Sequence, residues 1–142
     1  MFELSVKTHF SAAHHLRGYA GACANPHGHN WEIEVFVRGE GLDRTGFLVD
    51  FRELKARLRS VLGELDHRDL NALPVFLRRN PTSENLAHYL FDSLAERFDA
   101  PRCRVHRVTV CETPGTAASY WASETRRIPA RRGKRGKLAA NA

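Results

Sequence analysis

The chain has 142 residues, of which 42% are apolar and 27% are charged. This length predicts one domain, and this composition excludes collagen-like and disordered proteins. No stretch approaches the roughly 20 apolar residues of a membrane span. The first residues lack the pattern of a secretory signal, and the three cysteines form no CxxC pair. We therefore expect a cytoplasmic protein without a disulfide framework.

The positive charge is confined to the end of the chain. The formal net charge is +6, but residues 126–142 carry seven cations and no acid, which leaves 15 cations against 16 anions in residues 1–125. We expect residues 1–125 to form the folded domain and residues 126–142 to be a basic disordered tail, because like charges repel there and apolar residues are few. The tail either makes a weak contact with RNA or ligand phosphates, or has no set role. The charge of the folded domain gives no reason to expect nucleic acid.

The first half of the chain predicts two strands and a helix. Apolar and polar residues alternate over residues 2–10 and again over residues 32–37, which is the period of half-buried strands. Glycines and a proline predict a loop between them, over residues 14–28. Asp50 and Glu53 then stand at the spacing of a capping box, before a run with apolar residues at helical spacing.

The second half predicts a helix followed by two strands. The helix begins after the dipeptide Asn80–Pro81, with Thr82 or Ser83 as its cap, and carries one apolar stripe. Residues 105–112 and 116–122 have the pattern of strands and are joined through a proline and a glycine.

The order of these elements predicts an α+β fold. Strands that are neighbours in sequence and joined by short connections favour antiparallel pairing. We therefore expect a four-stranded antiparallel sheet with two helices on one face, in the order ββααββ. Such a sheet has two open edges, which proteins usually cover, and association of several copies into a ring is one way to cover them.

Histidines gather where the first two strands are expected to meet. His27 and His29 stand at i and i+2 at the start of the second strand, so their side chains lie on the same side. His14 or His15 closes the first strand, and it lies beside this pair if the two strands pair. Three neutral imidazoles leave the fourth position of a zinc ion open, as in catalytic zinc sites. The alternative is that these histidines are polar surface residues.

Two further segments carry reactive side chains. Cys23 precedes His27 by four residues, and near a metal or a histidine its thiolate serves as a base or nucleophile. Alternatively, Cys23 is itself a metal ligand or a small loop residue. Asp66 precedes His67, and a neighbouring carboxylate sets the tautomer and basicity of an imidazole. From the residues alone, a histidine that caps the end of the preceding helix is the better interpretation.

Glu112 ends an apolar strand. It shares the parity of Val108 and Val110, so it points to the face that these valines bury. A buried carboxylate needs a partner, and a flat amidine-like edge accepts it in a bidentate pair. The alternative is an exposed glutamate at the end of the strand.

Taken together, these residues fall in six motifs that occur in one order along the chain. The motifs are FSAAH at 10–14, CxxxHGHN at 23–30, GFLVDF at 46–51, LDH at 65–67, NPTSEN at 80–85 and CET at 111–113. In this the chain resembles the pyruvoyltetrahydropterin synthase/carboxytetrahydropterin synthase family, from residue 2 to about residue 121. The resemblance implies the tunnelling fold, in which trimers close barrels and two trimers stack as a hexamer with active sites between subunits.

The resemblance also implies a set of zinc ligands, with one ion per subunit. The residues that match them by position are His14, His27 and His29. His15 lies one place out of register and is not included.

The remaining functional residues of the family match by position as well. Cys23 matches the catalytic base, Asp66 and His67 match its relay partners, and Glu112 matches the acid that anchors the amino-pyrimidine edge of the pterin and takes part in the relay. Thr82, Ser83 and Glu84 match a segment that lines the pterin pocket. The cationic partner of the substrate triphosphate has no counterpart in a motif, and Arg17 and the tail are the candidates.

The interval between Cys23 and His27 separates two branches of the family. Its three residues resemble the bacterial branch, a lyase of the queuosine pathway. That branch converts 7,8-dihydroneopterin triphosphate to 6-carboxy-5,6,7,8-tetrahydropterin and releases acetaldehyde and triphosphate. The alternatives are the pyruvoyl-forming elimination of triphosphate from the same substrate, and a non-enzymatic module that binds pterin or RNA.

Overall fold

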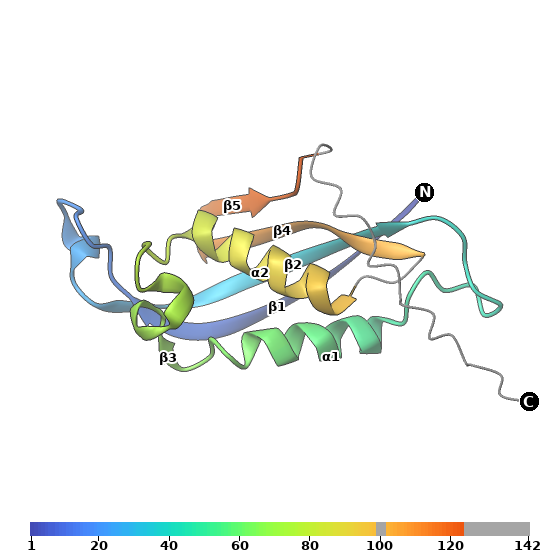
Figure 1. The fold of residues 1–142 in the computed structure, drawn as a ribbon, viewed down its shortest axis with the longest axis horizontal. Helices are drawn as coiled ribbons and strands as arrows, with labels where there is room; N and C mark the ends of the chain where they lie inside the picture. Colours follow the sequence, from blue (N-terminus) through green and yellow to red (C-terminus); the bar gives the residue numbers. More distant parts are fainter. Residues whose placement is uncertain (99–101, 124–142) are drawn as a thin grey trace, which may run out of the picture.

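A five-stranded sheet with two helices on one face forms the part of the chain that the structure, a computed structural model, describes: residues 1–98 and 102–123 (Figure 1). The strands are β1 (Phe2–His14), β2 (His27–Gly39), β3 (Arg68–Asp69), β4 (Cys103–Thr113) and β5 (Thr116–Tyr120), and the helices are α1 (Phe51–Leu62) and α2 (Ser83–Phe98). Single turns of 3-10 helix lie at Ala22–Ala24, Leu70–Ala72 and Pro74–Phe76. The predicted tail, residues 126–142, lies outside the described residues.

The sheet is mixed, with the strand order β3-β1-β2-β4-β5. The four long strands pair antiparallel, whereas β3 pairs in parallel with β1 at Ala12 and Ala13. The predicted α+β fold is therefore correct, but the predicted four-stranded antiparallel sheet and the order ββααββ are wrong, because β3 lies between the two helices in the chain. A strand of two residues has no periodicity that a sequence pattern could reveal.

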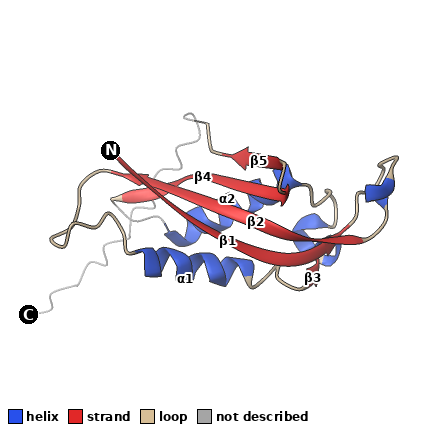
Figure 2. Cartoon of the chain, turned by 180° about the vertical axis from the view of Figure 1, so that it is seen from behind, coloured by secondary structure: helices blue, strands red, loops and turns tan. Residues whose placement is uncertain are grey.

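Both helices lie on the same side of the sheet, as the views from the two faces agree (Figures 1 and 2). The hydrophobic core fills the space between the sheet and the helices, because alternate residues of β1, β2 and β4 point toward the helices. On β2, for example, Trp31, Ile33, Val35 and Val37 are at most 1% exposed, whereas the glutamates between them face away from the core.

The helices begin at polar caps. Asp50 caps α1, because its carboxylate accepts a hydrogen bond from the Arg52 backbone N–H at 2.7 Å. The predicted capping box does not close, since Glu53 instead forms an ion pair with Arg57. At α2, Thr82 is the residue whose hydroxyl accepts from a free backbone N–H of the first turn. No helix within the described residues is long and apolar enough to cross a membrane.

The pairing of β1 with β2 brings the predicted histidines together. His14, the last residue of β1, is opposite His27, the first residue of β2, and Ala12 is opposite His29. The loop between the two strands therefore leaves and re-enters the sheet at this end, and the start of α2 lies beside the same end, because the His14 ring hydrogen-bonds to the Pro81 carbonyl.

Candidate active site

Three imidazole rings converge at the end of the sheet where β1 and β2 meet. The ring centroids are 4.6 Å apart for His14 and His27, 4.8 Å for His27 and His29, and 5.1 Å for His14 and His29. His14 is only 2% exposed, and the other two rings are half-buried. One ligand atom from each ring and one carboxylate oxygen of Glu112 all lie within 4.8 Å of one another.

The hydrogen bonds of two rings fix their tautomers. His14 donates from Nδ1 to the Pro81 carbonyl at 2.8 Å, and His27 donates from Nδ1 to the Asn25 carbonyl at 2.7 Å. Because a carbonyl oxygen only accepts, both protons are on Nδ1, and each neutral ring presents a lone pair at Nε2. These two Nε2 atoms face each other at 3.0 Å. Two lone pairs at this distance need a positive centre between or beside them.

Glu112 adds a negative charge to the same point. Its Oε1 lies 2.8 Å from His29 Nε2 and 3.3 Å from His14 Nε2, and its Oε2 accepts from the Ser83 hydroxyl at 3.4 Å. The sequence-based expectation that this glutamate points to the buried face and has partners is therefore met. Its partners within one chain are two of the imidazoles and the first residue of α2.

A metal ion fits this donor set better than a proton does. Burial lowers the pKa of His14 and so disfavours its cationic form, although its hydrogen bond to Pro81 and the charge of Glu112 act in the opposite direction. His29 Nε2 is buried and has no hydrogen bond of normal geometry among the described residues. Neutral imidazoles held at Nδ1 by carbonyl oxygens, with Nε2 aimed at a common point, are the usual arrangement of metal-binding histidines. The cluster can thus hold a metal ion.

Trp31 packs against two rings of the cluster, a role that the sequence did not predict. The indole is fully buried and meets the rings of His14 and His29 edge to face, at centroid distances of 4.8 and 5.1 Å. Its Nε1 donates to the Ala12 carbonyl, and its ring stacks on Phe10. These contacts restrict the rotation of two of the three imidazoles. Its parity with His29 on β2 is the signal that could have identified it.

Cys23 lies in the loop between β1 and β2, within the 3-10 turn Ala22–Ala24. Its thiol is free and half-buried, and its backbone carbonyl accepts from the Leu16 N–H at 2.8 Å. In the described part of the chain, no hydrogen bond joins this thiol to Asp66, His67 or the imidazole cluster. One chain therefore does not assemble the predicted base with its relay partners.

Asp66 and His67 form a pair at the edge of β1. Asp66 Oδ2 lies 2.9 Å from His67 Nδ1, and the other oxygen of Asp66 accepts from the Ser11 N–H at 2.9 Å. This backbone hydrogen bond, followed by the contact with His67, lowers the pKa of Asp66. The His67 backbone N–H donates to the Ser11 carbonyl, so His67 joins the sheet edge instead of capping α1.

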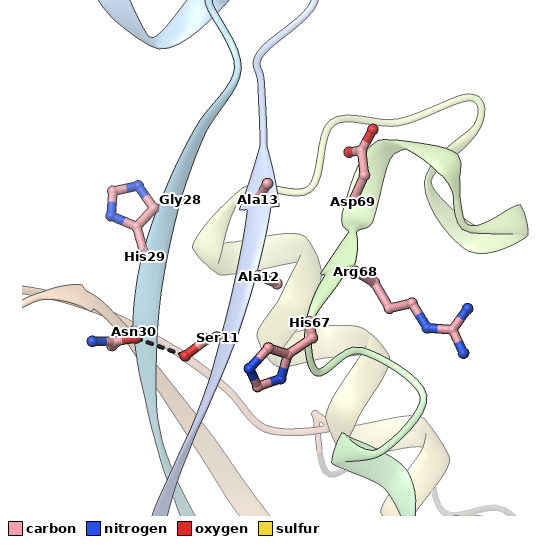
Figure 3. A pocket seen from close by; sticks show the side chains of 9 residues that line it. All are labelled: Ser11, Ala12, Ala13, Gly28, His29, Asn30, His67, Arg68 and Asp69. Carbon is pink, nitrogen blue, oxygen red and sulfur yellow. Dashed lines mark hydrogen bonds between the residues drawn. The ribbon is translucent and has the colours of Figure 1, made fainter.

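The His67 side chain is 81% exposed. It borders an open hollow of about 570 Å³ that residues of β1, β2 and β3 line (Figure 3). The small residues Ala13 and Gly28 and the hydrogen-bonded pair Ser11–Asn30 lie across this hollow from it. The pair Asp66–His67 is thus accessible from outside the chain.

The remaining candidates divide into two groups. Thr82 caps α2 and Ser83 contacts Glu112, so both lie at the edge of the cluster. Glu84 is exposed and, among the described residues, forms no side-chain hydrogen bond or ion pair. Arg17 is engaged elsewhere, because its guanidinium donates to three backbone carbonyls between Phe76 and Arg79. The sequence makes Arg17 a candidate partner of the triphosphate. In this structure its guanidinium is not free for that role.

Comparison with known proteins identifies the family of a chain with this fold and this cluster. Residues 3–123 match the sequence profile of the family described as 6-pyruvoyl tetrahydropterin synthase. The chain belongs to this family. A relative in the family from Bacillus subtilis, named 6-carboxy-5,6,7,8-tetrahydropterin synthase, is 38% identical over 84% of this chain and 84% of its own length. A Synechocystis protein of the same name is 37% identical over 79% of this chain and 87% of its own length.

A solved structure in the same family has the same fold. The 6-pyruvoyl tetrahydropterin synthase of Caenorhabditis elegans superposes with a TM-score of 0.78 at 32% identity, covering 86% of this chain and 96% of its own. The family resemblance that the six motifs indicated is therefore confirmed. The match ends at residue 123, before the basic tail.

Proposed function

We propose that this chain is a zinc-dependent lyase that converts 7,8-dihydroneopterin triphosphate to 6-carboxy-5,6,7,8-tetrahydropterin in queuosine (deazapurine) biosynthesis. The reaction consumes water and releases acetaldehyde and triphosphate. The observation that carries the proposal is the convergence of three imidazole nitrogens and the Glu112 carboxylate at the start of α2. The names of the Bacillus and Synechocystis relatives and the three-residue interval between Cys23 and His27 support this branch of the family.

His14, His27 and His29 are proposed to hold one zinc ion per subunit. Zinc, when bound, polarises substrate oxygen atoms as a Lewis acid and so acidifies the neighbouring C–H group. The three histidines provide nitrogen ligands, and the Pro81 and Asn25 carbonyls fix the orientation of two of them, His14 and His27. Three protein ligands leave a position for the substrate, which a fourth protein ligand would fill.

Glu112 is therefore assigned to the pterin instead of the metal. Its two oxygens accept a pair of N–H groups from the amino-pyrimidine edge, in a flat bidentate arrangement. Ser83, 3.4 Å from one of these oxygens, and the adjacent Thr82 and Glu84 are proposed to line the same pocket. Fixing the ring in this way holds the substrate side chain over the imidazole cluster and supplies orientation.

Cys23 is the proposed base, and Asp66 and His67 are the proposed relay. As a thiolate, Cys23 removes the proton from the acidified carbon. Asp66 sits against His67 Nδ1 and so keeps the proton of the neutral ring there, which leaves Nε2 to take up and return the proton from Cys23. Glu112 is close enough to the cluster to take part in these transfers.

The relay is proposed to form between copies of the chain. Within one chain, Cys23 and the exposed pair Asp66–His67 have no contact among the described residues, and the hollow beside His67 is open. In the described sheet, residues 2–11 of β1 have no strand partner on the side away from β2, and β5 has none on the side away from β4. Pairing of these edges closes a ring of three copies, and two rings give the hexamer typical of the family. We also place the protein in the cytoplasm, consistent with three cysteines that form no CxxC pair.

The test is incubation with 7,8-dihydroneopterin triphosphate, followed by the product mass and an acetaldehyde assay. Acetaldehyde together with the carboxylated product supports the proposal. A pyruvoyl product without acetaldehyde overturns it in favour of the pyruvoyl-forming reaction. No product, with RNA binding that disappears when residues 126–142 are deleted, indicates a binding module instead.

Two variants separate the base from the metal ligands. Cys23→Ala is expected to abolish turnover and to retain about one zinc per subunit, because three histidines suffice to hold the ion. Cys111→Ala is the matched control, since this half-buried cysteine lies on β4 and points away from the face that carries Glu112. Loss of zinc from the Cys23 variant would instead make this residue a ligand.

A further inference from the structure

The loop that carries Cys23 begins with three hydrogen-bonded residues, two of which are held by asparagines from distant parts of the chain. Beyond the end of β1, Asn71 binds both backbone groups of His15: its Oδ1 accepts from the N–H and its Nδ2 donates to the carbonyl, each at 2.9 Å. Leu16 donates its N–H to the Cys23 carbonyl at 2.8 Å. The two side-chain groups of an asparagine here take the place of a neighbouring strand.

Asn80 repeats this arrangement two residues further on. Its Oδ1 accepts from the Arg17 N–H and its Nδ2 donates to the Arg17 carbonyl, again at 2.9 Å each. Residues 15 and 17 are thus fixed on one side, while Leu16 between them is bonded to Cys23 on the other. The position of Cys23 therefore depends on two amides that come from outside its own loop.

Asn80 also adjoins the group that orients a predicted metal ligand. The next residue is Pro81, whose carbonyl accepts from His14 Nδ1. A residue before proline favours extended backbone, which restricts the conformation of Asn80 next to this carbonyl. The Asn80 carbonyl is itself bonded to Asn85 of α2 at 2.8 Å, which ties this dipeptide to the helix.

Arg17 closes the connection from the other side. Its guanidinium donates to the carbonyls of Phe76, Leu77 and Arg79, in the segment that leads to Asn80. Two kinds of hydrogen bond therefore join the start of the loop to the segment before α2. The Asn80 amide bonds to the Arg17 backbone, and the Arg17 guanidinium bonds to three carbonyls. Arg17 is exposed, so this arrangement is not needed to fill the core.

We propose that Asn80 is a positioning residue that holds the Cys23 loop in a fixed place relative to the imidazole cluster. It acts through Arg17 and Leu16 on the cysteine, and through Pro81 it stands next to the carbonyl that orients His14. This inference rests on the proposed role of Cys23 as the catalytic base. The placement of the loop by Asn80 does not depend on which reaction takes place at this site.

The test compares Asn80→Ala with wild type as the zinc-loaded protein. Asn80→Ala is expected to lower kcat about 100-fold, the order of loss when a reacting group is displaced by about 1 Å. The dissociation constant for neopterin is expected to stay unchanged, because Glu112 and Ser83 are held by other contacts. Alkylation of Cys23 by iodoacetamide, followed by peptide mass mapping, is expected to become severalfold faster as the loop opens, while alkylation of Cys111 in the same sample stays constant.

Two further variants make the result specific. Asn80→Asp keeps the acceptor for the Arg17 N–H but replaces the donor to the Arg17 carbonyl by an acceptor, so it is expected to restore only part of the kcat that Asn80→Ala loses. Arg79→Ala is the matched control, because its side chain bonds only to the Val75 carbonyl among the described residues and its own carbonyl remains to accept from Arg17.

The outcomes separate this inference from the proposed function. Unchanged Cys23 alkylation and unchanged kcat in Asn80→Ala overturn the inference, and so does weaker neopterin binding with kcat intact, which would make Asn80 a pocket residue. A lower melting temperature with neither effect shows a merely structural role and also overturns it. If wild type has no turnover on the triphosphate, the proposed function fails, whereas faster alkylation in Asn80→Ala still supports the positioning of the loop.

Discussion

Asn71 offers a direct test of how the end of β1 is held. The residue is 8% exposed, and both polar groups of its side chain bond to the backbone of His15, next to the predicted ligand His14. In Asn71→Ala, the N–H and the carbonyl of His15 both lose their partner. The local backbone of Asn71 is retained, since its own N–H is bonded to Asp69.

The expected loss of stability follows from these two bonds. A hydrogen bond within a protein contributes about 1 kcal/mol net, and a group left partly buried without a partner costs about 1–3 kcal/mol. Because His15 is half-buried and water reaches part of its backbone, we expect a decrease of about 2–3 kcal/mol in the free energy of unfolding. For a domain of this size, about 4 °C per kcal/mol gives a melting temperature lower by about 10 °C.

Urea unfolding followed by circular dichroism measures this change. The protein concentration must be fixed, because association adds to apparent stability. The control is Asn30→Ala, which removes an exposed hydrogen bond to Ser11 and is expected to cost less than about 0.5 kcal/mol. A loss for Asn71→Ala no larger than for Asn30→Ala would refute the reasoning, because water would then replace the amide at no cost.

Three further predictions concern the imidazole cluster. Zinc added to chelator-treated protein at 100 times its dissociation constant is expected to raise the free energy of unfolding by about 2.7 kcal/mol, and so to raise the melting temperature. In His27→Ala this increase in melting temperature should vanish. Trp31→Phe is expected to weaken zinc binding about 10-fold in a chelator competition, because the edge contacts that orient His14 and His29 are lost, and equal affinity would contradict the role of the indole. The third prediction concerns the metal-free protein, in which the folded state lowers the pKa of His14 below 6.5. As the pH falls below 6.5, the unfolded chain therefore binds a proton at this residue before the folded chain does, and the free energy of unfolding decreases. Above pH 6.5 this contribution of neutral His14 to the free energy of unfolding is fully present. Urea midpoints at pH 7.5 and 5.5 should therefore differ more in wild type than in His14→Gln, and equal differences would exclude this group as the cause.

The metal half of the candidate site follows from the sequence because it depends on strand periodicity. The alternation of β2 places His27 and His29 on the face that carries the buried valines, and antiparallel pairing with β1 brings His14 to the same end. Glu112 follows from the same rule on β4. Periodicity and antiparallel pairing left His14 and His15 as alternatives and left an exposed Glu112 open, and the family resemblance implied the choice of His14 and a partnered Glu112.

The contacts that hold these side chains do not follow from periodicity. The Pro81 and Asn25 carbonyls, the amides of Asn71 and Asn80 and the pairing of His67 with Ser11 all join irregular segments that are far apart in the chain or lie in loops. Irregular segments have no period, and their place is decided by which buried backbone groups need a partner. The same reason explains why β3 was missed, since its two residues pair with β1 only after the turn that follows α1 has returned to the sheet.

The two halves of the site differ in what they depend on. The imidazoles are held by the register of β1 and β2, by the buried Trp31 and by a carbonyl next to α2, all of which exist within one chain. Cys23 and the pair Asp66–His67 stand on exposed segments at different places on the surface, and His67 is 81% exposed. If the proposed roles hold, we expect metal binding to need only a folded chain, and proton transfer between these groups to need a second copy that brings them together. Dissociation of the assembly should therefore remove turnover before it releases the metal.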